Sequence, residues 1–111
     1  MSKEPIKILL IDDEVQFVDT LKDRLFLRGF DAAVAYNGED GLKKVKANPP
    51  DVIVLDLRMP GIDGFEVLRA VKKTNPEVQV IILTGHGGDA EEASAFRMGA
   101  YSFLRKPMDI D

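Results

Sequence analysis

Apolar residues along the chain form five short runs, and each run is separated from the next by a segment with a different spacing of apolar positions. The runs consist mostly of aliphatic and β-branched residues and have the length of single strands; they lie at residues 6–11, 32–36, 52–57, 78–84 and 101–104. Continuous apolar runs of this length are typical of strands that other elements cover on both faces. The pattern therefore predicts five buried strands.

Between these runs, apolar residues recur every three or four positions, which is the spacing of one face of a helix. One such segment begins near Val15 and ends at Gly29, and another ends at Asn75. Two further helices are expected at about 38–47 and 89–98. Helices thus fill all four gaps between the predicted strands.

Two acidic pairs mark the expected starts of the third and fourth helices, because Asp63 with Glu66 and Asp89 with Glu92 have the spacing of a capping box. Strand and helix then alternate from one end of the chain to the other. This order predicts an α/β fold, a doubly wound parallel sheet of five strands with right-handed crossovers and helices on both faces. Few residues remain after the fifth strand, so we expect no helix to follow it.

Length, charge and composition narrow the possible functions. The 111 residues, of which 45% are hydrophobic, suffice for one domain with one core. A net charge of -4 and the lack of any Lys or Arg run argue against binding to nucleic acid and to membrane surfaces. The sequence has no cysteine, which excludes thiolate chemistry, and its first residues lack the apolar stretch of a signal peptide. We therefore expect a cytoplasmic location.

Polar residues of complementary chemistry follow four of the predicted strands. They are Asp12, Asp13 and Glu14 after the first strand, Asp56 after the third, Thr84 after the fourth and Lys106 after the fifth. In open parallel sheets, ligands gather at the edge formed by the carboxyl ends of the strands. Crowded carboxylates repel one another unless a cation joins them, and oxygen ligands with room for water suit Mg²⁺. The sequence thus predicts a magnesium site beside Asp56.

A carboxylate in such a place can act as a nucleophile, as in enzymes that form an aspartyl phosphate. Phosphoryl transfer depends mainly on positioning and on the neutralisation of charge. Lys106 and the cation would hold the phosphoryl oxygens, and the Thr84 hydroxyl would donate to one of them. Taken alone, Asp12 is also a plausible N-cap for the first helix, and this alternative stays open.

Four motifs together resemble the receiver domain of two-component response regulators. They are DDE at 12–14, DLRMPGIDG at 56–64, LTGHG at 83–87 and GAYSFLRKP at 99–107. The resemblance runs in order and register from about Ile6 to Pro107. It implies a flavodoxin-like sheet with strand order 2-1-3-4-5, and a single receiver domain at residues 1–111 that stops before or within the fifth helix usual in the family.

The resemblance also implies a role for each site residue. Asp56 would be the phosphoacceptor, and Asp13 would bind Mg²⁺ directly. Asp12 would help to place the metal, often through water, and the backbone carbonyl of Arg58 would be a further ligand. Lys106 would pair first with Asp56 and then with the phosphoryl group.

Two more residues would take part in switching and two in the lifetime of the phosphoryl group. Thr84 would swing toward the phosphate, and Phe103, at the place of the switch aromatic of the family, would turn inward behind it; packing in the core is the alternative for Phe103. We hypothesise that the side chains of Arg58 and His86 set the rate at which the phosphoryl group is lost. His86 as an ordinary surface residue is the alternative.

The partners that the resemblance implies are a sensor histidine kinase or phosphotransfer protein as donor, and an output domain or effector outside this chain. A dimer through the face of the fourth helix and fifth strand is a further expectation. The chain would assist its own phosphorylation and dephosphorylation without being a turnover enzyme.

Two other classes of function remain as alternatives. One is a docking module that works without phosphorylation. The other is a Mg²⁺-dependent phosphohydrolase with an aspartyl nucleophile, similar to haloacid dehalogenase-like enzymes. Those enzymes use an Asp two positions after the nucleophile as a general acid, whereas this chain has Arg58 there, which disfavours turnover.

Overall fold

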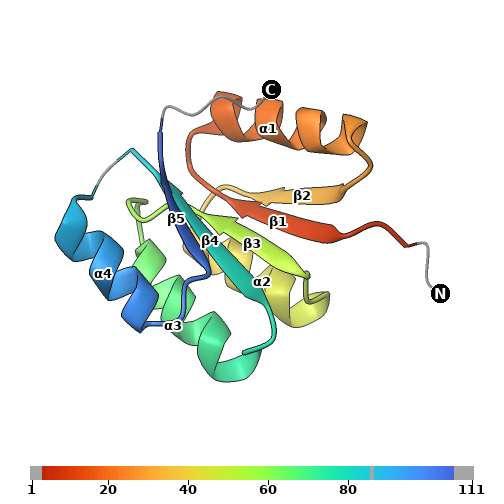
Figure 1. The fold of residues 1–111 in the computed structure, drawn as a ribbon. Coiled ribbons are helices and arrows are strands. Elements are labelled where there is room, and N and C mark those ends of the chain that lie inside the picture. The colour runs from red at the N-terminus through yellow and green to blue at the C-terminus, as the bar shows by residue number, and fades with distance from the viewer. Residues whose placement is uncertain (1–3, 86, 107–111) are drawn as a thin grey trace.

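The computed structural model describes residues 4–85 and 87–106, and it shows five parallel strands and four helices in alternation (Figure 1). The strands are β1 (Lys7–Ile11), β2 (Asp31–Ala35), β3 (Val52–Leu55), β4 (Gln79–Thr84) and β5 (Ser102–Arg105). The helices are α1 (Val15–Leu27), α2 (Gly38–Ala47), α3 (Gly64–Thr74) and α4 (Asp89–Arg97). Every predicted element is present, with ends shifted by one or two residues.

The sheet has the strand order β2-β1-β3-β4-β5, and every neighbouring pair is parallel. The order implied by the resemblance is therefore confirmed. Successive strands are added on one side of β1 up to β2, and on the other side from β3 to β5, so the strand order reverses between β1 and β3. The carboxyl ends of these two central strands therefore border the crevice in which such sheets bind ligands.

Apolar side chains pack on both faces of the sheet. On one face, α2, α3 and α4 cover a large core that contains Val45, Leu68 and Ala95 together with inward residues of the strands. On the other face, α1 contributes Val18 and Leu21 to a smaller core. Burial on both faces explains why the strands consist of continuous runs of apolar residues in the sequence.

The helix starts agree only in part with the predicted capping pairs. Asp63 caps α3 as predicted, since its Oδ1 accepts a hydrogen bond from the Glu66 amide at 3.0 Å. The pair predicted for α4 is wrong by one residue: Gly88 is the N-cap, and its amide donates to the Glu91 carboxylate at 2.8 Å. Glu92 instead pairs with Arg105 of β5 at 2.9 Å, a contact between residues 13 positions apart that local spacing does not predict.

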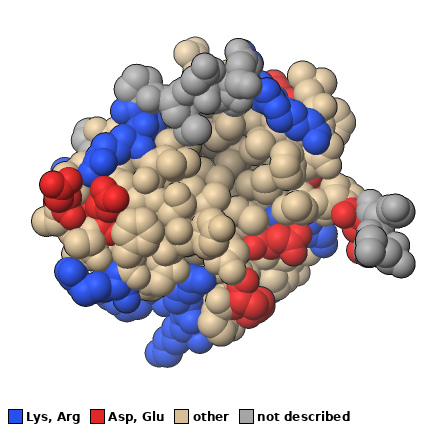
Figure 2. All heavy atoms as spheres, viewed as in Figure 1, with Lys and Arg blue, Asp and Glu red and all other residues tan. Residues whose placement is uncertain are grey.

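The sheet face that carries α1 is covered incompletely within the described residues. No helix follows β5 there, and Leu104 keeps 39% of its surface exposed. Figure 2 shows a mostly uncharged surface beside α1, with charged side chains around its margin. None of the helices in residues 4–85 and 87–106 has both the length and the apolar character needed to cross a bilayer.

Candidate functional site

Two carboxylates leave the central strands at the edge where the strand order reverses. The Asp12 amide donates to the Ala35 carbonyl at 3.1 Å, and the Asp56 amide donates to the Ile11 carbonyl at 3.0 Å. These bonds extend the ladder of the sheet by one residue, and they fix both aspartates beside each other. Only 4% of Asp12 and 3% of Asp56 is exposed, so each charge needs a partner within the protein or a bound cation.

A third carboxylate completes an acidic cluster. Asp12, Asp13 and Asp56 each offer one carboxylate oxygen, and these oxygens lie within 4.8 Å of one another. Asp13 is exposed, so the cluster opens to solvent on one side. Hard oxygen ligands with space for water are what Mg²⁺ prefers. The residues present therefore fit the ion that the sequence predicts.

Lys106 brings a positive charge from the end of β5 to this cluster. Its amide donates to the Thr84 carbonyl at 2.9 Å, which places the side chain beside the carboxyl end of β4. The ammonium lies 2.8 Å from Asp12 Oδ2 and 3.8 Å from Asp56 Oδ2, and it also contacts the carboxylate of Glu14. The structure thus brings Lys106 to Asp56, with Asp12 and Glu14 as nearer partners.

Burial and charge act in opposite directions on the two ends of this ion pair. Burial raises the pKa of Asp12, and the negative charge of Asp56 adds to this, whereas hydrogen bonds from Lys106 and the Glu14 amide oppose it. For Lys106, burial alone would lower the pKa, but the hydrogen bonds to Asp12 and Glu14 and the nearby charges outweigh it and raise the pKa. Lys106 therefore stays protonated, while negative charge remains in excess at the site.

The raised pKa of Asp12 makes the stability of the metal-free protein depend on pH. A group whose pKa is higher in the folded state contributes stability below its ordinary pKa of about 3.9, and this contribution is lost as the pH rises through the folded-state pKa. We therefore expect Asp12→Asn to be more stable than the wild type at neutral pH with a chelator present. Urea unfolding at several pH values measures this difference, which should vanish toward acid pH. A difference that does not change with pH would contradict the prediction.

Thr84, Arg58 and His86 differ in how the structure places them. Thr84 is fully buried at the end of β4, next to the strand that carries Asp56. Arg58 is exposed, with its amide 3.5 Å from Asp56 Oδ1, and it lines a surface hollow of about 540 Å³ together with Met59 and Glu91. His86 lies outside the described residues.

Phe103 points into the large core and keeps only 9% of its surface exposed. The guanidinium of Arg105 lies 5.3 Å from the centre of its ring, close enough for a cation–π contact. Arg105 also pairs with Glu92 and Asp89 on α4, at 2.9 and 3.6 Å. The aromatic residue expected to switch is thus linked to α4 through Arg105, whose role was not predicted from the sequence.

Gly64 is a second residue whose role the sequence did not reveal. Its backbone lies so close to the loop after β3 that an added Cβ would stand 2.3 Å from the Asp56 carbonyl oxygen. The nearest atom is backbone, so no side chain can rotate away to make room. Close approach to the loop that carries Asp56 therefore explains why a glycine stands at this position.

Replacing Gly64 by Ala should therefore lower the free energy of unfolding by about 1–3 kcal/mol, the usual cost of overpacking. Urea denaturation measures the change. Gly85→Ala is the matched control, because its Cβ would meet nothing closer than the Lys106 Cβ at 4.0 Å, and a change within about 0.5 kcal/mol is expected there. Equal losses in the two variants would show that close approach at Gly64 is not the cause.

The family model of the response regulator receiver domain matches residues 8–111. The chain belongs to this family. Receiver domains of this family are signalling modules of two-component systems.

Similar proteins agree with this assignment. The transcriptional regulatory protein GlrR of Escherichia coli is 36% identical over all 111 residues, which make up 25% of GlrR. A receiver domain protein of Clostridium thermocellum has a TM-score of 0.88 and 37% identity, covering 95% of this chain and 85% of that one. A response regulator of Burkholderia pseudomallei, solved with a phosphorylated aspartic acid, calcium ion and citrate, has a TM-score of 0.89 and 28% identity over 95% of this chain and 62% of its own. The chain thus spans about a quarter of the length of GlrR.

Proposed function

We propose that this receiver domain accepts a phosphoryl group on Asp56 from the phosphohistidine of a sensor histidine kinase or phosphotransfer protein, in a reaction that needs Mg²⁺. One observation carries the proposal: buried Asp56 shares one edge of the sheet with Asp12, Asp13 and Lys106. The phosphorylated aspartic acid in the Burkholderia pseudomallei neighbour supports it.

In the proposed reaction, an oxygen of the Asp56 carboxylate attacks phosphorus while the bond from phosphorus to the donor nitrogen breaks. Lys106 holds negative charge on the transferred oxygens, and Thr84 donates its hydroxyl hydrogen to one of them. Mg²⁺, when held by Asp12, Asp13, Asp56 and the backbone carbonyl of Arg58, supplies further neutralisation of that charge.

Conformational switching is the second part of the proposal. Thr84 would move toward the phosphoryl group, and Phe103 would follow it inward. Arg105 supports a path to the surface, because it contacts the Phe103 ring and also pairs with Glu92 on α4. A change at Phe103 would then alter the face formed by α4 and β5, which is a two-state element of the kind that phosphorylation controls.

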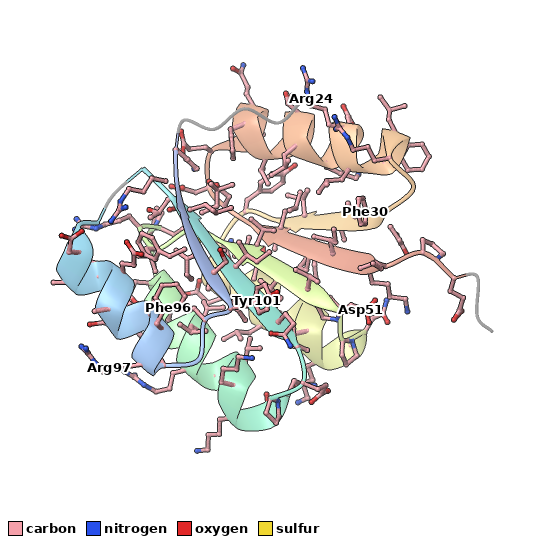
Figure 3. The ribbon with its side chains drawn as sticks, in the orientation of Figure 1. Arg24, Phe30, Asp51, Phe96, Arg97 and Tyr101 are labelled. Carbon is pink, nitrogen blue, oxygen red and sulfur yellow. The ribbon has the colours of Figure 1, made fainter. Side chains whose placement is uncertain are left out.

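Proteins that bind the face formed by α4 and β5 would distinguish its two conformations. Phe96 on α4 and Tyr101 just before β5 are exposed by 45% and 69% and lie on this side of the molecule (Figure 3). We propose that this face forms a dimer or contacts an output domain, since GlrR is four times as long as the part matched here. The same proposal includes a cytoplasmic location and a single receiver domain. It also includes tuning of the lifetime of the phosphoryl group by the side chains of Arg58 and His86.

Incubation with acetyl phosphate and Mg²⁺, followed by measurement of the intact mass, tests this function. We expect one labile phosphoryl group per chain and no continuing release of phosphate beyond its slow loss. A folded protein that binds Mg²⁺ but forms no adduct would favour a docking module that works without phosphorylation. Steady release of phosphate from many substrates would instead indicate a hydrolase.

A further inference from the structure

The ammonium of Lys106 lies beyond hydrogen-bond distance of Asp56, the residue whose phosphorylation it is expected to assist. Its Nζ lies 2.8 Å from Asp12 Oδ2 but 3.8 Å from Asp56 Oδ2. A hydrogen bond between an ammonium and a carboxylate is about 2.7–2.9 Å long, so Lys106 stands about 1 Å too far from Asp56 to form one. Lys106 has contacts outside the acidic cluster that favour this position.

The start of α1 supplies two such contacts. The carboxylate of Glu14, the N-cap residue of this helix, accepts a hydrogen bond from the Lys106 ammonium. The ring of Phe17 faces the same ammonium, with its centre 4.5 Å from Nζ. Residues three positions apart lie on one face of a helix. The side chain of Lys106, which directly follows β5, therefore meets one face of the first turn of α1.

Phe17 is itself fixed by the core. It is half-buried and packs against the small cluster that includes Val18, Leu21 and Leu83. The ring offers its face to a cation that is only 10% exposed, where a cation–π contact is stronger than at an open surface. Lys106 thus has a carboxylate and an aromatic ring from α1 that hold it in addition to Asp12.

We propose that Glu14 and Phe17 are positioning residues that hold the Lys106 ammonium where it can meet a phosphoryl oxygen on Asp56, and not the resting Asp56 carboxylate. The inference rests on the proposed function. Interactions speed a reaction only if they are stronger in the transition state than in the ground state. A lysine bonded directly to Asp56 would stabilise the unreacted carboxylate. A lysine held about 1 Å farther away leaves room for the transferred phosphoryl oxygens and is already placed to stabilise their negative charge.

A role in stability alone is a poor explanation for Glu14. Its side chain is 60% exposed, and ion pairs with such exposure contribute little to folding. The contact with Lys106 is therefore expected to matter for the reaction more than for the fold. A test has to separate these two effects and to show that Glu14 acts through Lys106.

The rate of phosphorylation by acetyl phosphate at saturating Mg²⁺ provides the first readout. Glu14→Gln removes the negative charge that attracts the Lys106 ammonium but keeps an oxygen that can accept its hydrogen bond, and it should slow the reaction about tenfold. Phe17→Leu keeps an apolar side chain but removes the ring, and it should slow the reaction about threefold. Asp23→Asn removes a charge from an exposed position of α1 and is the control, with an unchanged rate expected.

The same substitutions in a Lys106→Met background decide whether the effect passes through Lys106. There, Glu14→Gln and Phe17→Leu should change the remaining rate less than about twofold, since coupled residues are not additive. A tenfold effect that persists in this background would overturn the proposal. So would a Glu14→Gln protein that reacts as fast as, or faster than, the wild type.

The ¹H–¹⁵N resonance of the Lys106 ammonium gives a second readout that needs no phosphodonor. We expect it to shift in Glu14→Gln and in Phe17→Leu and to stay in place in Asp23→Asn. An unchanged resonance in the first two variants would overturn the positioning role even if their rates fall. If the wild type accepts no phosphoryl group at all, the proposed function itself fails and the inference fails with it, whatever the resonance shows.

Discussion

Lys106→Met should slow phosphoryl transfer to Asp56 by about 100- to 1000-fold, which is the usual effect of losing one preorganised donor to developing charge. Methionine keeps an unbranched chain of similar length but has no charge. In the structure, the Lys106 ammonium lies 2.8 Å from Asp12 Oδ2 and 3.8 Å from Asp56 Oδ2, and its raised pKa keeps it protonated at neutral pH. The time course of adduct formation by intact mass measures the rate.

The control for this variant is its stability and its affinity for Mg²⁺. Removal of a buried cation leaves Asp12 and Asp56 without that partner, so some loss of stability is expected. A bound cation can replace part of the lost charge, and Mg²⁺ should therefore still bind and stabilise the variant. A folded Lys106→Met protein that reacts at the wild-type rate would remove Lys106 from the mechanism.

Removal of Mg²⁺ with a chelator should lower the rate of phosphorylation about 1000-fold, because a cation at the reacting oxygens supplies several kcal/mol of charge stabilisation. Asp13→Asn should have a similar effect, since Asp13 is the exposed member of the acidic cluster. When Mg²⁺ is added back, the phosphorylation rate of the wild type should recover fully, whereas that of Asp13→Asn should recover only in part.

Binding of Mg²⁺ can also be followed without any reaction. At about 100 times its Kd, the ion should raise the free energy of unfolding of the wild type by about 2.7 kcal/mol. In Asp13→Asn, the same concentration should have a much smaller effect. Phosphorylation that proceeds equally with and without chelator would contradict the assignment of the acidic cluster as a magnesium site.

The strands were predictable because burial on both faces of the sheet requires continuous apolar runs, which are visible in the sequence. The run at 52–57 marked β3, and it was too long by two residues because Asp56 and Leu57 are buried after the strand has ended. The strand order came from the resemblance and not from the periodicity, since apolar spacing does not say which strands are neighbours. The alternation of strands and helices alone would have allowed other orders.

The members of the site were predictable, but their contacts were not. The rule that ligands gather at the carboxyl ends of parallel strands brought Asp12, Asp56 and Lys106 together before the structure was known. Which carboxylate lies nearest to Lys106 depends on side-chain rotamers and on the way β5 meets α1, and the sequence does not carry this information. The cation–π contact of Phe17 and the link from Arg105 to α4 also join residues far apart in the chain.

The position of the phosphoryl group on the chain shows whether Asp56 is the phosphoacceptor. The wild type would be treated with acetyl phosphate and Mg²⁺ and then reduced with borohydride, which converts a phosphorylated Asp to homoserine, and peptide mass mapping would locate the product. Assignment of Asp56 as the phosphoacceptor predicts homoserine at position 56 alone, and none anywhere in Asp56→Asn. A product at Asp12, Asp13 or Glu14, or an adduct that persists in Asp56→Asn, would contradict it.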